Sequence, residues 1–509
     1  MNVHTKLTEW RAAITVAAMT NVVEGLNSTH LEYSVVRNRR FFSLGAAFLI
    51  AGVVLSGCSL AETSYPPTLQ DLIPPPAVSP SAGRSPRQWL VDAHGRFRHL
   101  LPRDPEPLLT ENLTGEAQPP TDVWDYFDRK PTNIGRVYNN WAGLRQSAQS
   151  GGRPYQEYDP SLAWNGFEEI SLKTLDGHEL FGRLGWARSA DGAIQDADCI
   201  ILLPGVYGHN LTLRTRDMAA GLRASGFHVL AIEPRGHGQT GIRHPELPFT
   251  FGVLETCDLL AAADWLERQP HVKETGAMGH SWGANTALLA AWYQDRELGD
   301  PDVGPELSKR MPVLPPGRHL QAGVIAVSCI PKFEDVIDLM ETPRSVFNSP
   351  GINNLQNTVR RRMHDRGSSD DSGSLRKLIA FEFARSALGY ETGVDEGLRF
   401  LRLMPHKGQT VGPKLERARV PTLIVHSGND PLIPVGDAAD LLKGVHNPQV
   451  AALIMAGGGH VGYLPYARQY MFNMVVDFFG THGGTIERPG AHQPTPTLAR
   501  GSDRIGSAN

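Results

Sequence analysis

The sequence predicts an α/β fold with a mostly parallel central sheet that helices cover on both faces. Between about residues 166 and 480, short apolar runs alternate with amphipathic segments of helical length. Short continuous apolar runs are typical of strands that are buried on both faces, as in parallel sheets. Regular alternation of strands and helices favours parallel pairing, with the functional residues at the carboxyl ends of the strands.

The first two strands of this region form a predicted hairpin. Residues 167–175 and 178–186 flank the turn signal Asp176-Gly177. Six buried strands are then expected, at residues 199–203, 228–232, 275–278, 323–328, 422–426 and 450–455. Helical patterns separate them, at residues 217–224, 258–269, 284–293 and 466–479. The predicted sheet therefore begins antiparallel and continues parallel.

A G-x-S-x-G pentapeptide, Gly279-His280-Ser281-Trp282-Gly283, joins the strand at 275–278 to the helix that follows it. In this context the chain turns so sharply that the serine backbone is strained and the flanking positions require glycine. The turn exposes the hydroxyl of Ser281 as a nucleophile. It also places the N–H of Trp282 at a helix N-terminus, where it can donate to a developing oxyanion.

An acid and a histidine follow two later strands. Asp430 lies just after the strand at 422–426, and His460 lies in a glycine-rich loop after the strand at 450–455. Taken alone, Asp430 is typical of a turn former before Pro431, and His460 is one of 19 histidines. Their positions past successive strands favour catalytic roles instead. Ser281, Asp430 and His460 then form a candidate triad in the chain order Ser…Asp…His.

Two further loops follow the first buried strands. Gly205 allows a close backbone approach after the strand at 199–203, and the N–H of Val206 is the expected second oxyanion donor; the alternative is a simple tight turn. After the next strand, the segment from Glu233 to Gly238 resembles a D-x-R-G-x-G turn with Glu in place of Asp. Its Arg235 and His237 are expected to be structural.

Together these segments resemble the α/β-hydrolase superfamily over about residues 165–480. The segments Asn429-Asp430-Pro431 and Gly458-Gly459-His460-Val461-Gly462-Tyr463 resemble its YheT-type branch more narrowly. The resemblance implies a serine hydrolase of small-molecule or lipid carboxylic esters, acting through an acyl-enzyme, with no metal or organic cofactor. Two other functions stay open: an acyltransferase with the same triad, and a non-catalytic surface binding protein on a hydrolase scaffold.

A lid insertion is expected at about residues 331–419, where the chain makes a long excursion between two strands. It contains helical patterns at 333–340 and 375–388 and a charged loop from Arg360-Arg361-Arg362 to Asp370-Asp371. Apolar lid residues are expected either to line the acyl pocket or to be plain core; they are Phe333, Val336, Ile337, Leu339 and Met340. The arginine run is expected to be a solvated face, with contact to anionic headgroups as the alternative.

The N-terminal region predicts export and lipid anchoring. Arg37, Arg39 and Arg40 precede an apolar run at 41–54, which ends in Leu55-Ser56-Gly57-Cys58. This pattern resembles a bacterial lipoprotein signal in which Cys58 is acylated, so residues 1–57 are an extension plus a removed signal. The mature chain is then anchored at the periplasmic or cell-surface face of a membrane. An ordinary cleaved signal and a single anchor helix are the alternatives.

The flanking segments carry few structural signals. Residues 58–90 are Pro-rich and predict an extended tether, 91–165 an N-terminal decoration of the domain, and 481–509 a disordered tail. Cys199 and Cys329 adjoin apolar runs and are expected to be buried thiols. A net charge of −4 argues against nucleic-acid binding through a basic face. The sequence has no CxxC pair that would indicate a zinc site. The oligomeric state stays open.

Overall fold

The computed structural model describes residues 84–102, 106–110, 143, 146, 164–296, 300–341, 350–405 and 413–483. The chain divides into two units, residues 1–64 and 65–509. The predicted signal at 1–57, Cys58, most of the tether and the C-terminal tail beyond residue 483 lie outside the described residues. Within the described part, no helix has the length and apolar character needed to cross a membrane.

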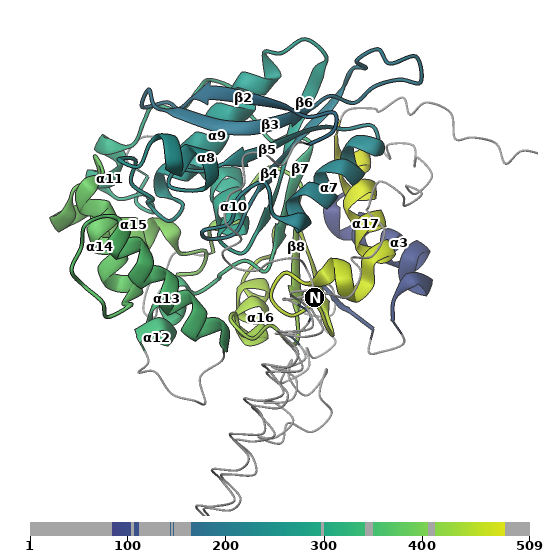
Figure 1. Ribbon diagram of the computed structural model, residues 1–509. Coiled ribbons are helices and arrows are strands. Elements are labelled where there is room, and N and C mark those ends of the chain that lie inside the picture. Colours follow the sequence, from purple (N-terminus) through teal and green to yellow (C-terminus); the bar gives the residue numbers. More distant parts are fainter. Residues whose placement is uncertain are drawn as a thin grey trace, which may run out of the picture. The chain divides into compact units, whose positions relative to one another are not determined.

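The described residues form a central sheet in the strand order β1-β9-β8-β7-β6-β4-β5-β3-β2 (Figure 1). Neighbouring strands among β4 to β9 pair in parallel, whereas β1 joins β9, and β2 and β3 join the β5 edge, in antiparallel pairing. The predicted hairpin and the six predicted buried strands are all present, which confirms a mostly parallel sheet. The strands are β1 (Leu108–Leu109), β2 (Glu168–Lys173), β3 (Glu179–Gly185), β4 (Ala197–Leu203), β5 (His228–Glu233), β6 (Val272–His280), β7 (Gly323–Val327), β8 (Thr422–Ser427) and β9 (Val450–Met455).

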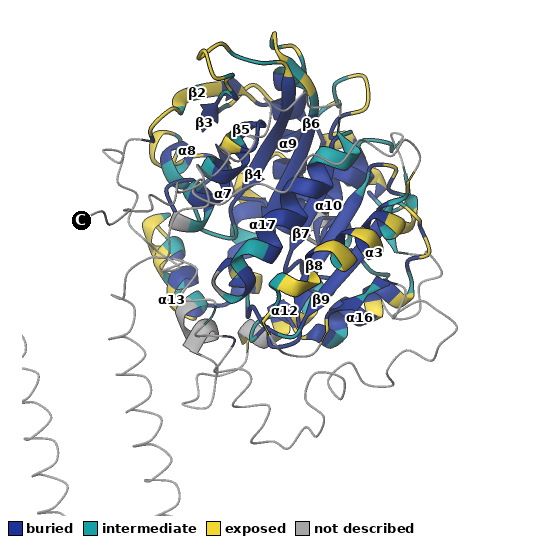
Figure 2. Cartoon of the chain, turned by 90° about the vertical axis from the view of Figure 1, so that its right-hand side faces the viewer, coloured by how far each residue is buried: buried dark blue, intermediate teal, exposed yellow. Residues whose placement is uncertain are grey.

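Helices cover both faces of the sheet, as expected from the buried strands. On one face lie α3 (Pro86–Phe97), α7 (Leu213–Ala224) and α17 (Tyr463–His482), and on the other α9 (Val253–Glu267) and α10 (Trp282–Tyr293) (Figure 1). Successive β4 residues alternate between two hydrophobic clusters, with Ile200 and Leu202 in one and Ile201 and Leu203 in the other. Figure 2 shows the central strands buried, with exposed residues at β2 and on α3. The remaining helices are α8 (Gly238–Arg243), α11 (Pro305–Arg310), α16 (Val435–Lys443) and the 3₁₀ helices η3 (Arg98–Leu100) and η4 (Lys414–Arg417).

The predicted lid region is helical, and its helices gather beside the α9 and α10 layer (Figure 1). They are α12 (Phe333–Glu341), α13 (Pro350–Asp365), α14 (Leu375–Arg385) and α15 (Tyr390–Leu401). The sequence did not predict α13 and α15. The prediction of a charged loop was wrong for its first residues, which are helical. Arg360, Arg361 and Arg362 lie on α13, because Val359 and Met363 give that helix a buried apolar stripe at a spacing of one turn.

Helix α3 begins at Pro86, inside the segment predicted as an extended tether, so that boundary was wrong. Ser85 forms a capping box with Gln88, and Pro86 occupies a favourable first position. Trp89 is buried, and its indole N–H donates to Asp477 of α17 at 2.7 Å. Burial of that large apolar ring stabilises the packing of this segment on the domain.

We predict that Trp89→Ala lowers the free energy of unfolding by about 3–5 kcal/mol, because it empties a buried site the size of an indole. Urea denaturation measures this change. Val91→Ala is the matched control on the same helix, since Val91 is 39% exposed, and it should change the stability by less than about 0.5 kcal/mol. Equal, small effects of both substitutions would show that α3 is not part of the cooperative fold.

Candidate active site

The turn between β6 and α10 holds Ser281 in a strained backbone conformation, with φ 55° and ψ −116°. Two glycines make this turn possible. A Cβ on Gly279 would overlap the carbonyl oxygen of Gly283, and a Cβ on Gly283 would overlap that of Pro204. The N–H of Ser281 donates to the carbonyl of Val327 on the adjacent strand at 2.8 Å. Packing and hydrogen bonding therefore maintain a backbone conformation that is unfavourable by itself.

The structure brings Ser281, His460 and Asp430 together in one hydrogen-bonded row. Nε2 of His460 lies 2.8 Å from Oγ of Ser281, and Nδ1 lies 2.9 Å from Oδ2 of Asp430. The other oxygen of Asp430 accepts the N–H groups of Leu432 and Ile433 at 2.9 and 3.0 Å. With Nδ1–H held by a carboxylate, Nε2 is the ring nitrogen that can accept the proton of the serine hydroxyl.

The electrostatic environment of Asp430 keeps its carboxyl charged. Burial by itself raises the pKa of this group, but attraction to His460 and the hydrogen bond between them outweigh burial, so the pKa is lowered overall. A charged Asp430 stabilises the imidazolium that forms when His460 takes a proton. The arrangement is therefore suited to generating a nucleophilic oxygen at Ser281.

Two backbone segments adjoin Ser281, the start of α10 and the loop after β4. Trp282 is the first residue of α10, so its N–H has no acceptor within that helix. On the other side, a Cβ on Gly205 would lie 3.4 Å from Cβ and 3.9 Å from Oγ of Ser281. Gly205 begins a tight turn closed by the hydrogen bond from Gly208 N–H to its carbonyl at 2.9 Å, with Val206 next in the chain. Of the two predicted donors, Val206 thus lies in the turn beside the serine, and Trp282 directly follows the serine as the first residue of α10.

Residues 200–470, more than half of the chain, match the family model described as the alpha/beta hydrolase family. The chain belongs to the alpha/beta hydrolase family. The central sheet, the strained serine turn and the order of the three side chains along the sequence agree with this assignment. Hydrolase is accordingly the enzyme class of the chain.

Solved structures of hydrolases resemble the chain at low identity. The Pyrococcus furiosus esterase Pf2001 has 17% identity and a TM-score of 0.37, over 62% of this chain and 93% of that one. The 2,6-dihydroxy-pseudo-oxynicotine hydrolase has 14% identity and a TM-score of 0.41, over 78% and 86% of the two chains. The Pyrococcus horikoshii acylaminoacyl peptidase has 16% identity and a TM-score of 0.38, over 62% and 41%. At this level of identity, the substrates of these proteins do not transfer to the chain.

The loop after β5 is structural, as predicted, and it also contacts the loop after β4. Arg235 is buried between Asp258 and Asp176, with contacts of 2.6 Å to each carboxylate. The carboxyl of Glu233 accepts the N–H of Asn210 at 3.3 Å and that of Gln239 at 2.7 Å. Burial raises the pKa of Glu233 to about 7. Glu233 therefore links two segments: the residues that follow the predicted oxyanion turn, and the loop after β5.

Sequence reasoning missed a pair of amide side chains that join the loops of Asp430 and His460. Oδ1 of Asn429 accepts the N–H of Gly459 at 2.8 Å. Oε1 of Gln146 accepts from Nδ2 of Asn429 at 3.0 Å and from the N–H of Gly458 at 2.8 Å. Asn429 was recognisable from its position beside Asp430. Gln146 gave no signal, because it lies far away in a segment without periodicity.

The apolar lid residues on α12 are core rather than an open pocket lining. Phe333, Val336 and Ile337 are buried, and the Phe333 ring meets the Trp282 ring edge-on with centroids 4.9 Å apart. The side chains of Leu339 and Met340 lie outside the described residues. A small cavity of about 10 Å³ lies beside Val206 and Trp282, which line part of it. It has room for about one water molecule.

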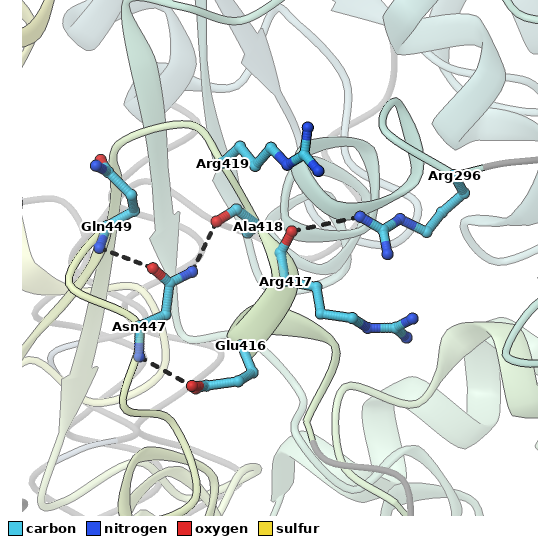
Figure 3. A pocket seen from close by; sticks show the side chains of 7 residues that line it. All are labelled: Arg296, Glu416, Arg417, Ala418, Arg419, Asn447 and Gln449. Carbon is cyan, nitrogen blue, oxygen red and sulfur yellow. Dashed lines mark hydrogen bonds between the residues drawn. The ribbon is translucent and has the colours of Figure 1, made fainter.

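A larger hollow has a volume of about 470 Å³, and Figure 3 shows the side chains that line it. It is lined by Arg296, Glu416, Arg417, Ala418, Arg419, Asn447 and Gln449. Several of these residues directly precede β8 and β9, whereas Asp430 and His460 follow the same strands. The hollow is therefore at the opposite edge of the sheet. Arg296 and Arg417 both pair with Asp300 there, at 3.8 and 3.4 Å.

The three cysteines of the described residues, Cys199, Cys257 and Cys329, are buried free thiols, which confirms the prediction for Cys199 and Cys329. Burial raises the pKa of Cys329 to about 12. Among the described residues, no group of three or more His, Cys, Asp or Glu side chains is placed to hold a metal ion.

We predict that Glu233 contributes to the pH dependence of folding. Its folded pKa of about 7 exceeds the ordinary value of 4.5, so its stabilising contribution is complete below that ordinary value and is lost as the pH rises through the folded pKa. Glu233→Gln removes this titration. The free energy of unfolding of the variant, relative to that of the wild type, should therefore increase as the pH rises from 4.5 to about 7. Urea denaturation at both pH values measures the difference.

Glu179→Gln is the control for this prediction, because the Glu179 side chain is 46% exposed. Its stability relative to the wild type should change little over the same range. A wild-type-to-Glu233→Gln difference that does not depend on pH would contradict the prediction.

Proposed function

We propose that the chain is a serine hydrolase that cleaves carboxylic esters by two-step acyl transfer. The observation that carries the proposal is the hydrogen-bonded row of Ser281, His460 and Asp430 beside two candidate N–H donors. His460 takes the hydroxyl proton as Oγ of Ser281 attacks the ester carbonyl carbon. The N–H groups of Val206 and Trp282 then stabilise the oxyanion, at about 3–4 kcal/mol for each donor.

The tetrahedral intermediate collapses when His460 returns the proton to the departing alkoxide, which leaves as an alcohol. Ser281 is then acylated. Water, deprotonated by the same imidazole, attacks the acyl carbon and releases the carboxylic acid, while the serine regains its proton. Asp430 keeps Nδ1–H oriented through both steps and balances the positive charge on the ring. The resemblance to the YheT-type branch supports an ester substrate.

We also propose that the mature chain is exported and held on a membrane by acyl groups on Cys58. The support is the sequence Leu55-Ser56-Gly57-Cys58 after a basic flank and an apolar run. Two or more acyl chains are needed for stable anchoring, and a lipidated N-terminal cysteine supplies them. A long Pro-rich segment follows Cys58, so the hydrolase domain would act on lipid or small-molecule esters near the bilayer.

We predict that a fluorophosphonate probe labels the wild type and not Ser281→Ala. Asp430→Asn should fold but lower kcat for p-nitrophenyl esters by about 10⁴-fold, because Nδ1–H loses the carboxylate that orients it. Ser189→Ala, in the loop between β3 and β4, is the matched serine control and should keep the wild-type rate. Repeating the assay with an added alcohol separates hydrolysis from acyl transfer, since a transferase forms a new ester instead of an acid. Labelling of Ser281→Ala at the wild-type rate would rule out the proposed nucleophile.

For the anchor, we predict that a bacterial host incorporates labelled fatty acid into the wild type but not into Cys58→Ser. The variant should move from the membrane to the soluble fraction with unchanged kcat, because the triad is distant in sequence and intact. Ser64→Ala is the control and should stay labelled. Membrane association of Cys58→Ser equal to that of the wild type would exclude acylation of Cys58 as the anchor.

A further inference from the structure

The turn that carries the N–H of Val206 is held through its next residue, Tyr207. Tyr207 has φ 55°, a left-handed backbone that a bulky residue adopts only when its surroundings enforce it. Its N–H donates to Nε2 of His237 at 2.8 Å, and its ring stacks on the His237 ring with centroids 5.8 Å apart. His237 is therefore the direct support of this turn.

The protonation state of His237 suits this role. Its Nδ1 donates to the carbonyl of Arg235 at 2.7 Å, so the tautomer leaves Nε2 as an acceptor. Burial, followed by the nearby positive charge of Arg362, lowers the pKa of His237 to about 3. The ring is consequently neutral across ordinary working pH, and it accepts from Tyr207 throughout.

Arg362 of the lid helix α13 also contacts this turn. Its guanidinium lies 5.4 Å from the centroid of the Tyr207 ring, and its Nη1 donates to the carbonyl of Gly236 at 2.6 Å. Contrary to the solvated face expected from the arginine run, the Arg362 side chain is only 16% exposed. Arg362 thus touches both the residue after Val206 and the residue before His237.

A buried acid anchors Arg362 within the lid. Glu382 of α14 accepts from Nε of Arg362 at 3.3 Å and from Arg366 at 3.2 Å. Its carboxyl also accepts the N–H of Phe249 at 3.2 Å, and its side chain is 0% exposed. Two helices of the lid and the segment before α9 therefore meet at one carboxylate. The guanidinium of Arg362 is fixed in the geometry that reaches Tyr207.

We propose that Arg362 is a positioning residue for the oxyanion hole, acting through Tyr207 and Gly236 on the turn that presents the N–H of Val206. The inference rests on the proposed serine-hydrolase function. In this arrangement, the docked lid is part of the catalytic site rather than only its cover. A planar guanidinium can donate to Gly236 and to Glu382 while its face lies on the Tyr207 ring, whereas a lysine ammonium cannot do all three.

The test compares Arg362→Gln with Arg361→Gln, an exposed neighbour on the same helix. For each variant, kcat and KM for p-nitrophenyl acetate are measured per active site titrated with the fluorophosphonate, together with the Ki of a trifluoromethyl ketone that forms a tetrahedral adduct. Arg362→Gln should lower kcat by about 10- to 100-fold, with KM changed less than about threefold. The Ki should rise by the same factor as kcat falls. Arg361→Gln should match the wild type in all three.

Two further variants keep the proposal testable if Arg362→Gln folds poorly. Arg362→Lys keeps the charge without the planar group and should recover only part of kcat. Tyr207→Leu removes the ring but keeps the backbone bond to His237, and it should lower kcat in the same way. In the double variant, the loss from Arg362→Gln should be smaller than in the wild type, because the two residues act through one contact.

Three results would overturn the inference. The first is that Arg362→Gln and Arg361→Gln have the same kcat per titrated site, and the second is a loss of kcat in Arg362→Gln without a matching rise in Ki. The third is that the losses of kcat from Arg362→Gln and Tyr207→Leu are additive in the double variant. In each of these cases the wild type is active, so the proposed function is unaffected. A wild type with neither labelling nor ester turnover would instead overturn the proposed function, and the positioning role with it.

Discussion

The hydrogen bond between the imidazole of His460 and the buried carboxylate of Asp430 determines what the rest of the fold must provide. The two residues are 30 positions apart in the chain, so the bond requires the loops after β8 and β9 to lie side by side. Parallel pairing of these strands achieves this, because it brings their carboxyl ends to one edge of the sheet. The amides of Asn429 and Gln146 then join the two loops directly. Ser281 reaches the same edge from the end of β6, where it lies within hydrogen-bond distance of His460.

Strained backbone at two neighbouring turns is the second feature of the site. Ser281 and Tyr207 both have positive φ values, and neither is a glycine. Each conformation persists because its surroundings supply hydrogen bonds that a relaxed backbone would lose: Val327 for Ser281, and His237 for Tyr207. The turn at Ser281 is thus held by a main-chain hydrogen bond to the sheet, and the turn at Tyr207 by a hydrogen bond to a side chain. The proposed role of Arg362 would make substitutions in the lid relevant to the chemistry at Ser281.

Most of the sheet and the three central side chains could be predicted from the sequence, since both leave local signals. Buried parallel strands are short apolar runs, and a serine between two glycines after such a run is typical of a nucleophile turn. Local patterns failed where the deciding contact is distant. The run of arginines on α13 concealed a helix whose apolar stripe packs on other lid helices. The end of the Pro-rich segment is helical from Pro86, and its Trp89 binds the distant Asp477. The role of Gln146 and the inward position of Arg362 could not be predicted either, because each depends on partners that only the folded chain brings close.

The most direct test of the account is to identify the covalent intermediate. The purified protein is mixed with p-nitrophenyl acetate, quenched in acid during the first turnovers, digested and analysed by mass spectrometry. A single acetyl group on the peptide that contains Ser281, removed on longer incubation and absent in His460→Ala, is the predicted result. Turnover of the ester with no acetylated serine, or with the acetyl group on another residue, would contradict the claim that Ser281, His460 and Asp430 act together as the catalytic group.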